Sequence, residues 1–196
     1  MADRRVVLAS SSPRRSDLLT QIGIAFTVVP ADIDEREQVG EDPVAYVCRL
    51  AVGKAGVGEF ADADIVIAAD TTVDVDGQIL AKPEDEADAR RMLTLLSGRT
   101  HDVHTGVAVR HRGRTEIEVA TTRVSMVVLD AATVDWYLAT GEPFGKAGAY
   151  ALQGAASALV ERVEGSVSNV IGLPLAVLDT VLRRFGETLV ALSTTP

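Results

Sequence analysis

The sequence predicts an α/β protein built on a mixed, twisted β-sheet with flanking helices. Predicted strands and helices alternate along the chain, and some strands are paired as hairpins, which favours a mixed sheet over a purely parallel one. The run 65–69 is continuously apolar, as expected for a central strand buried on both faces. No Gly-x-Gly-x-x-Gly follows the first predicted strand and no Walker sequence is present, so the Rossmann dinucleotide fold and the P-loop are disfavoured.

The chain begins with an apolar strand over 6–8 that leads into a helix. Ser12 suits the position before the first helical residue, and Pro13 suits the first helical position, because its fixed φ matches a helix. Gly23 ends this helix, and a strand over 26–29 follows.

A second helix starts at Asp42 and carries Lys54 on its apolar face, where a lysine is unusual. The apolar strand 65–69 stops at Asp70. Asp76-Gly77 then separates two short apolar stretches and is typical of a two-residue hairpin turn.

The second half continues with a helix over about 85–97 and two long strands over 103–110 and 115–128. The inward positions of the second strand change parity between Thr121 and Val124, which predicts a β-bulge there. The remaining elements are a helix capped by Asp130, a glycine-bounded loop at 145–154, a strand near 159–163 and a final helix from Pro174.

Composition narrows the class of protein. A chain of 196 residues suits a single domain over 1–196. The net charge of −9 disfavours binding to a nucleic-acid polymer, which needs a basic face. Neither a membrane-spanning apolar segment nor a signal-peptide pattern is evident, so we expect a soluble, cytoplasmic protein without a membrane partner.

The first candidate site follows the first strand. Ser10, Ser11 and Ser12 bring three hydroxyls to a helix start, and Arg14 and Arg15 add two guanidinium groups. Phosphate fits such a site, because a helix N-terminus favours negative charge and an arginine fork matches phosphate geometry. The alternative is a capped surface helix with two solvated arginines.

Asp70 is the best single candidate for chemistry, since α/β sheets place ligands at the C-terminal ends of buried strands. The alternative is an aspartate that caps its own loop through Thr71 or Thr72. Lys82 lies just across the predicted hairpin and can return toward Asp70.

Other polar residues fit a phosphate site. Glu35 lies in an acidic loop; carboxylates beside phosphates hold Mg²⁺, although an exposed loop explains them as well. Lys54 either extends its ammonium to solvent or points to a phosphate. Lys146 lies where backbone approaches a ligand closely, and Gln153 carries the donor and acceptor needed to read a base edge. The histidines lack metal-ligand spacing, so a transition-metal site is not expected.

Taken together, these stretches resemble the Maf family of nucleoside triphosphate pyrophosphatases. The matching motifs follow one order from end to end: 8–15 (LASSSPRR), 69–71 (ADT), 81–83 (AKP), 96–101 (LSGRTH), 141–143 (GEP), 146–150 (KAGAY), 153–154 (QG) and 172–174 (GLP).

The resemblance implies hydrolysis between the α and β phosphates with a divalent cation, Mg²⁺ or Mn²⁺. It also implies two lobes around a central cleft, as in inosine-triphosphatase-like folds, and often a homodimer. By position, Asp70 is the implied proton acceptor, with Lys82 and Glu35 at the catalytic centre and Glu35 and Asp70 as metal ligands. Substrate contacts are implied for the following residues: Ser10, Arg14, Arg15, Lys54, Thr71, Lys146 and Gln153.

Within the family, KAGAY followed by Gln153-Gly154 is similar to the branch that acts on dTTP and UTP. In that branch an aspartate often precedes the lysine, whereas Gly145 stands here. Two alternatives stay open: a non-catalytic nucleotide sensor that regulates cell division, and a pyrophosphatase specific for purines or 7-methyl-GTP.

Overall fold

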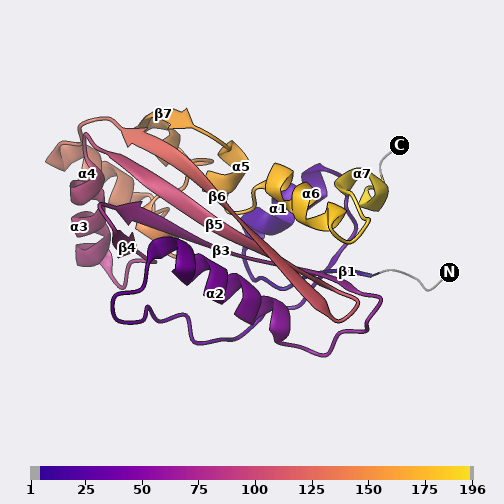
Figure 1. Ribbon diagram of the computed structural model, residues 1–196. Helices are drawn as coiled ribbons and strands as arrows, with labels where there is room; N and C mark the ends of the chain where they lie inside the picture. The colour runs from indigo at the N-terminus through magenta and orange to yellow at the C-terminus, as the bar shows by residue number, and fades with distance from the viewer. Residues whose placement is uncertain (1–4, 195–196) are drawn as a thin grey trace.

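A seven-stranded mixed sheet runs through the computed structural model, which describes residues 5–194 (Figure 1). The strands lie in the order β2-β1-β3-β5-β6-β7, and β4 pairs with β3 outside this path. β1, β2 and β3 are parallel, whereas the other pairings are antiparallel, so the predicted mixed sheet is confirmed. The strands are β1 (Val6–Leu8), β2 (Thr27–Val28), β3 (Ile65–Val75), β4 (Gln78–Leu80), β5 (Thr100–His111), β6 (Arg114–Met126) and β7 (Val160–Glu164).

Seven α-helices flank the sheet within the described residues, together with two short 3₁₀ turns. Three of the helix starts are capped as the sequence indicates: Asp42, Asp85 and Asp130 each accept a backbone N–H from the first turn. The helices are α1 (Pro13–Gln21), α2 (Pro43–Gly56), α3 (Glu86–Leu96), α4 (Ala131–Ala139), α5 (Val167–Ile171), α6 (Leu175–Arg183) and α7 (Leu189–Leu192), and the 3₁₀ turns are η1 (Ala147–Ala149) and η2 (Ala155–Ala158).

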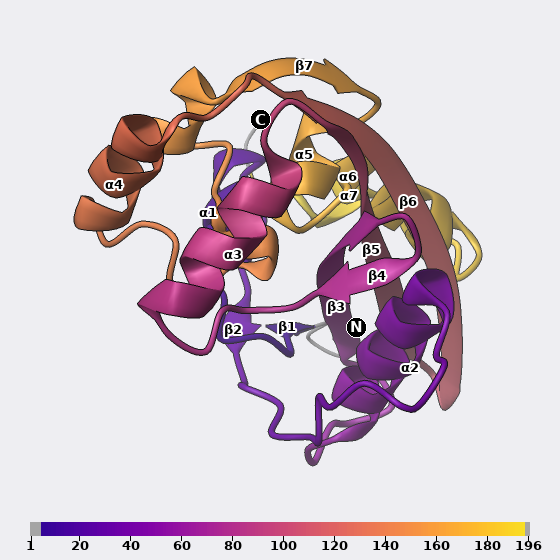
Figure 2. The ribbon, with the colours of Figure 1, turned by 90° about the vertical axis from the view of Figure 1, so that its left-hand side faces the viewer.

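The two faces of the sheet are covered differently. α2 lies alone across one face, where its alanines pack on Val66, Ala68 and Ala108 (Figures 1 and 2). On the other face, α1 and α6 cover one end of β3 and β5, while α3 and α4 cover the other end. Two separate apolar clusters therefore share the same pair of long strands.

Three expectations about the elements need correction. The register of β5 with β6 is continuous from Thr100↔Ser125 to His111↔Arg114, so the predicted bulge is wrong; the irregularity lies where β6 meets β7. The parity changes because the two ends of β6 are buried on opposite faces, with Ile117 and Val119 toward α2 and Val124 toward α3 and α4.

The second correction concerns β2, which is shorter than the predicted 26–29. The third concerns the C-terminal helices, because α5 and α7 are absent from the prediction and α6 is not the last helix. Both are single-turn helices, too short to show an apolar period in the sequence.

α2 approaches the sheet so closely at Gly106 that no side chain fits there. A Cβ added to Gly106 would lie 2.6 Å from the carbonyl oxygen of Val47 on α2. Backbone therefore packs directly on backbone, and this contact sets the distance between α2 and β5.

We expect Gly106→Ala to lower the free energy of unfolding by about 2 kcal/mol, because α2 must move away from β5. Urea denaturation measures the change. Gly56→Ala is the matched control, since a Cβ at Gly56 meets nothing within 4 Å. This control should stay within about 1 kcal/mol of wild type, because alanine favours helix over glycine. Equal effects of the two variants would contradict the proposed packing constraint.

Candidate active site

The site lies at a gap in one edge of β3. β5 pairs with the other edge of β3 without interruption from Val66 to Asp74. On the gap side, β1 pairs with β3 as far as Ile67, and the pairing of β4 with β3 begins at Val73. No strand of residues 5–194 pairs with the segment of β3 between these two residues. Asp70 and Thr71 lie in this gap.

The sequence predicts Asp70 at the end of its strand, but the residue lies in the middle of β3. The apolar run ends there because the buried environment becomes polar, while the backbone continues to pair with β5. The carboxyl end that adjoins the site belongs to the neighbouring parallel strand β1, which stops at Leu8. The cavity therefore lies at the carboxyl end of β1, where α/β sheets place their ligands.

A cavity of about 510 Å³ opens at the gap. All ten residues predicted for the site line it: Ser10, Arg14, Arg15, Glu35, Lys54, Asp70, Thr71, Lys82, Lys146 and Gln153. They come from both ends of the chain and from both faces of the sheet, so the structure brings the complete set together.

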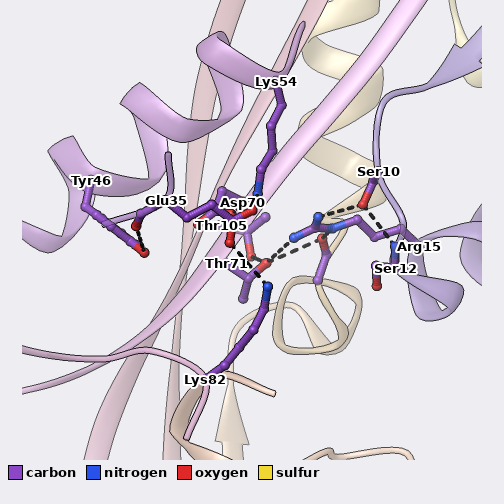
Figure 3. Close-up of polar contacts among 11 residues, drawn as sticks. Ser10, Ser12, Arg15, Glu35, Tyr46, Lys54, Asp70, Thr71, Lys82 and Thr105 are labelled. Atoms are coloured by element: carbon purple, nitrogen blue, oxygen red, sulfur yellow. Dashed lines mark hydrogen bonds and ion pairs between the residues drawn. The ribbon is translucent and has the colours of Figure 1, made fainter. Parts of the chain in front are cut away.

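On the α2 face, the ammonium of Lys54 joins two carboxylates (Figure 3). Its Nζ lies 2.6 Å from Oδ1 of Asp70 and 2.7 Å from Oε1 of Glu35. Lys54 and Asp70 are both buried. The alternative interpretation, in which Lys54 extends its ammonium to solvent, is therefore wrong.

Glu35 receives a second cation, because Nζ of Lys82 lies 3.2 Å from its Oε2. Lys82 thus returns to the site, but to Glu35 rather than to Asp70. Burial raises the pKa of Glu35, while Lys54 and Lys82 lower it by more, so that this pKa lies below its ordinary value. The hydroxyl of Tyr46 donates to the Glu35 carbonyl at 2.9 Å and fixes the loop to α2.

On the opposite face, the guanidinium of Arg15 is held by three oxygens (Figure 3). It donates to the Gly172 carbonyl at 2.8 Å, to Oγ of Ser10 at 2.9 Å and to Oγ1 of Thr71 at 3.2 Å. Burial lowers the pKa of Arg15, but guanidinium stays protonated in proteins. Its hydrogen-bond partners are all neutral, and the nearby carboxylates of Asp70 and Glu35 favour its charged form.

Arg14 is half-buried and donates to the Ile171 carbonyl at 3.3 Å. Two solvated arginines on a surface helix are thus excluded. Ser12 does precede the first residue of α1, but its side chain makes no capping hydrogen bond. Instead Oγ of Ser10 accepts the Ser12 N–H at 3.3 Å.

Lys146 and Gln153 line the cavity from the segment between α4 and β7. The Lys146 ammonium binds the carbonyl of Glu142 at 2.5 Å and that of Phe144 at 3.3 Å, within its own loop. Burial lowers the pKa of Lys146, as does the charge of Arg14, while Glu142 opposes them. Gln153 is exposed at the rim of the cavity.

Several residues of the site were missed by sequence reasoning. Arg36 lines the cavity and pairs with Asp34. Of the acidic residues in this loop, Glu35 is the one that lines the cavity. Tyr46 and the Ile171-Gly172 carbonyls also belong to the site. The sequence signal for this position is the glycine itself, which allows the chain to turn there at a φ of +124°. A lone glycine does not reveal which side chain its carbonyl binds.

The carboxylates of Glu35 and Asp70 are the metal-ligand candidates. Within residues 5–194, no group of three or more His, Cys, Asp or Glu side chains is arranged to hold a metal ion. The described chain also contains no helix of the length and apolarity that crossing a membrane requires. The histidines bind protein groups; Nε2 of His101, for example, lies 2.8 Å from the Tyr150 hydroxyl.

The fold and the cavity define a mixed α/β protein with a cleft lined by lysine and arginine side chains and a carboxylate pair. Residues 5–185 match the Maf family, described as Maf-like protein, and the chain belongs to this family. The resemblance to the Maf family that the sequence motifs indicate is thereby confirmed.

Curated relatives carry the name dTTP/UTP pyrophosphatase. One from Anaeromyxobacter dehalogenans is 52% identical over 186 residues, which cover 93% of this chain and 94% of the relative. One from Citrifermentans bemidjiense is 49% identical over 189 residues, with 95% and 98% covered. Among solved structures, the Staphylococcus aureus Ham1 protein aligns with a TM-score of 0.44 and 17% identity, over 63% of this chain and 72% of that one.

We expect Lys54→Met to destabilise the protein by about 3 kcal/mol at pH 7, because two carboxylates then lack their shared counter-ion. The lowered pKa of Glu35 stabilises the fold above the ordinary value of 4.5, and this contribution is lost as the pH falls through the lower folded pKa. The difference between wild type and variant should therefore shrink below about pH 4.5. Urea denaturation from about pH 3 to pH 7 measures it.

Lys82→Met is the control for this prediction. The Lys82 side chain is 62% exposed, so its pairing with Glu35 is screened by water. We expect a loss below about 1 kcal/mol. A loss in Lys54→Met that does not change with pH would contradict the role of the carboxylates.

Proposed function

We propose that the protein is a nucleoside triphosphate pyrophosphatase that hydrolyses dTTP and UTP to the monophosphate and pyrophosphate. The observation that carries the proposal is the gap in β3, where two carboxylates lie among lysine and arginine side chains. The names of the curated relatives support the reaction and its substrates. An acidic chain that gathers its cations in one cavity suits a small polyanion better than a polymer.

The phosphates have donors on both faces of β3. Ser10 and Arg15 offer hydroxyl and guanidinium groups on the α1 side, while Lys82 and Lys146 offer ammonium groups on the other walls. These groups neutralise the triphosphate and hold it in position. Lys146 can bind a phosphate only when it releases the carbonyls of its own loop.

Asp70 acts as the general base. Lys54 donates to Oδ1 and thereby orients the carboxylate. The second oxygen can then accept a proton from the water that attacks between the α and β phosphates. Since β3 is paired with β5 at this point, the carboxylate is held by a rigid strand.

Glu35 and Asp70 would hold the divalent cation. The donor set fits, because carboxylate oxygens are what Mg²⁺ and Mn²⁺ prefer, and both groups already share one cationic partner in Lys54. When bound, such a cation neutralises phosphate charge and polarises the scissile bond.

Base selection falls to Arg14, Thr71 and Gln153. The Gln153 amide at the rim offers one acceptor and two donors to a base edge. Thr71 also orients Arg15, so it links base selection to phosphate binding. That the protein is a cytoplasmic homodimer stays a prediction from the sequence.

The first test is pyrophosphate release from a nucleotide panel with Mg²⁺ or Mn²⁺. The panel contains dTTP, UTP, CTP, GTP, 7-methyl-GTP and ITP. Selective turnover of dTTP and UTP is expected. Turnover of purines or of 7-methyl-GTP would move the protein to another branch, and nucleotide binding without turnover would favour a sensor.

We expect Asp70→Asn to lose roughly 10²-fold or more in kcat on dTTP, because an amide cannot accept the proton. Steady-state kinetics measures the loss. Asp62→Asn is the control, since Asp62 is exposed in the turn before β3. It should retain wild-type kcat, and near-normal turnover of Asp70→Asn would remove this residue from the mechanism.

We expect Gln153→Glu to change the ratio of kcat/KM values among bases, because a carboxylate offers acceptors only. Its unfolding free energy should stay within about 0.5 kcal/mol of wild type, since the side chain is exposed. Gln78→Glu on the exposed β4 edge is the control. Unchanged base preference would show that Gln153 does not read the base.

A further inference from the structure

The carboxylate of Glu142 lies outside the catalytic groups but binds the loop that carries Gln153. It follows α4, and its Oε2 accepts the backbone N–H of Ala155 at 2.8 Å. Its Oε1 accepts the N–H of Ala156 at 3.2 Å and the hydroxyl of Tyr137 at 2.9 Å. Glu142 therefore supplies acceptors to the first turn of η2, whose N–H groups lack partners within the helix.

The same carboxylate explains why Gly154 is a glycine. A Cβ at Gly154 would lie 2.0 Å from Oε2 of Glu142, which is far inside contact distance. Its φ is −113°, so backbone conformation does not require glycine. Gly154 is thus needed for the close approach of the Glu142 side chain.

Tyr137 extends this contact to the other end of the loop. Its hydroxyl donates to Glu142 and accepts the N–H of Ala151 at 3.3 Å. The segment 151–156 is consequently held at both ends, by Tyr137 and by Glu142. Between these two attachments lie Leu152 and Gln153, which line the cavity.

The ionised state of Glu142 strengthens these hydrogen bonds. Burial raises the pKa of Glu142, but the backbone donors of Ala155 and Ala156 and the Tyr137 hydroxyl lower it by more. Hydrogen bonds to a charged acceptor are stronger than neutral ones. The backbone carbonyl of Glu142 also binds Lys146, so one residue contacts both parts of the cavity wall.

We propose that Glu142, with Tyr137, is the positioning residue for base selection: it fixes the segment 151–156 so that Gln153 meets the base. This inference rests on the proposed function. Glu142 is not among the residues that line the cavity, and it acts through the loop.

The test compares Glu142→Ala, Glu142→Gln and Tyr137→Phe with wild type. For Glu142→Ala we expect the KM for dTTP to rise about tenfold or more, with kcat within about threefold and a weaker preference for dTTP over CTP. Glu142→Gln keeps one acceptor and should recover part of the loss. Tyr137→Phe should give a smaller change of the same kind.

Hydrogen exchange supplies a readout that does not depend on turnover. The amides of Ala155 and Ala156 should exchange faster in Glu142→Ala, whereas amides of β3 and β5 should keep wild-type protection. Glu161→Gln on the exposed part of β7 is the matched control and should change neither exchange nor KM. If Glu142→Ala does not fold, Glu142→Gln and Tyr137→Phe decide the question.

Two outcomes would overturn the inference. One is a folded Glu142 variant with wild-type KM and base preference; the other is a loss of kcat alone, as a general loss of stability would produce. If wild type hydrolyses no nucleotide, the proposed function fails, but the positioning role is still judged by exchange and by calorimetric binding of dTTP. Unchanged exchange and unchanged affinity would then reject it.

Discussion

Everything at the site depends on the one edge of β3 that is left open between β1 and β4. Because β5 pairs with the opposite edge from Val66 to Asp74, the strand continues across the gap. Helix α2 can then approach from one face and α1 from the other. Lys54 and Arg15 reach neighbouring residues of the same strand from opposite sides of the sheet.

The charges of the site compensate one another before any ligand is present. Lys54 lies between Asp70 and Glu35, so two carboxylates share one buried ammonium. Arg15, by contrast, has hydroxyl and carbonyl partners and keeps its full charge within the fold. The carboxylates are thus bound directly to ammonium groups, whereas Arg15 has only neutral hydrogen-bond partners and feels Asp70 and Glu35 from a distance.

Most of the helices and strands could be predicted from the sequence, because capping aspartates and glycine turns are local signals. Family motifs named ten residues that the structure brings to one cavity. The position of Asp70 within β3 could not, since the apolar run ends where the face becomes polar rather than where the strand ends. Sequence patterns also do not show that β6 is buried on opposite faces at its two ends. Contacts between distant segments, such as Arg15 with Gly172 or Glu142 with Ala155, carry no local signal at all.

Asp70 and Thr71 are consecutive residues whose side chains bind partners on opposite faces of one strand, Lys54 for the first and Arg15 for the second. Side chains alternate strictly along a strand, so the loss or gain of one residue between Ile65 and Asp70 would exchange their places. The threonine would then meet the lysine, and the carboxylate would face the guanidinium. A change of length within this stretch would therefore break both contacts, whereas a change of length in the loop before β3 or in the hairpin after it would leave them in place.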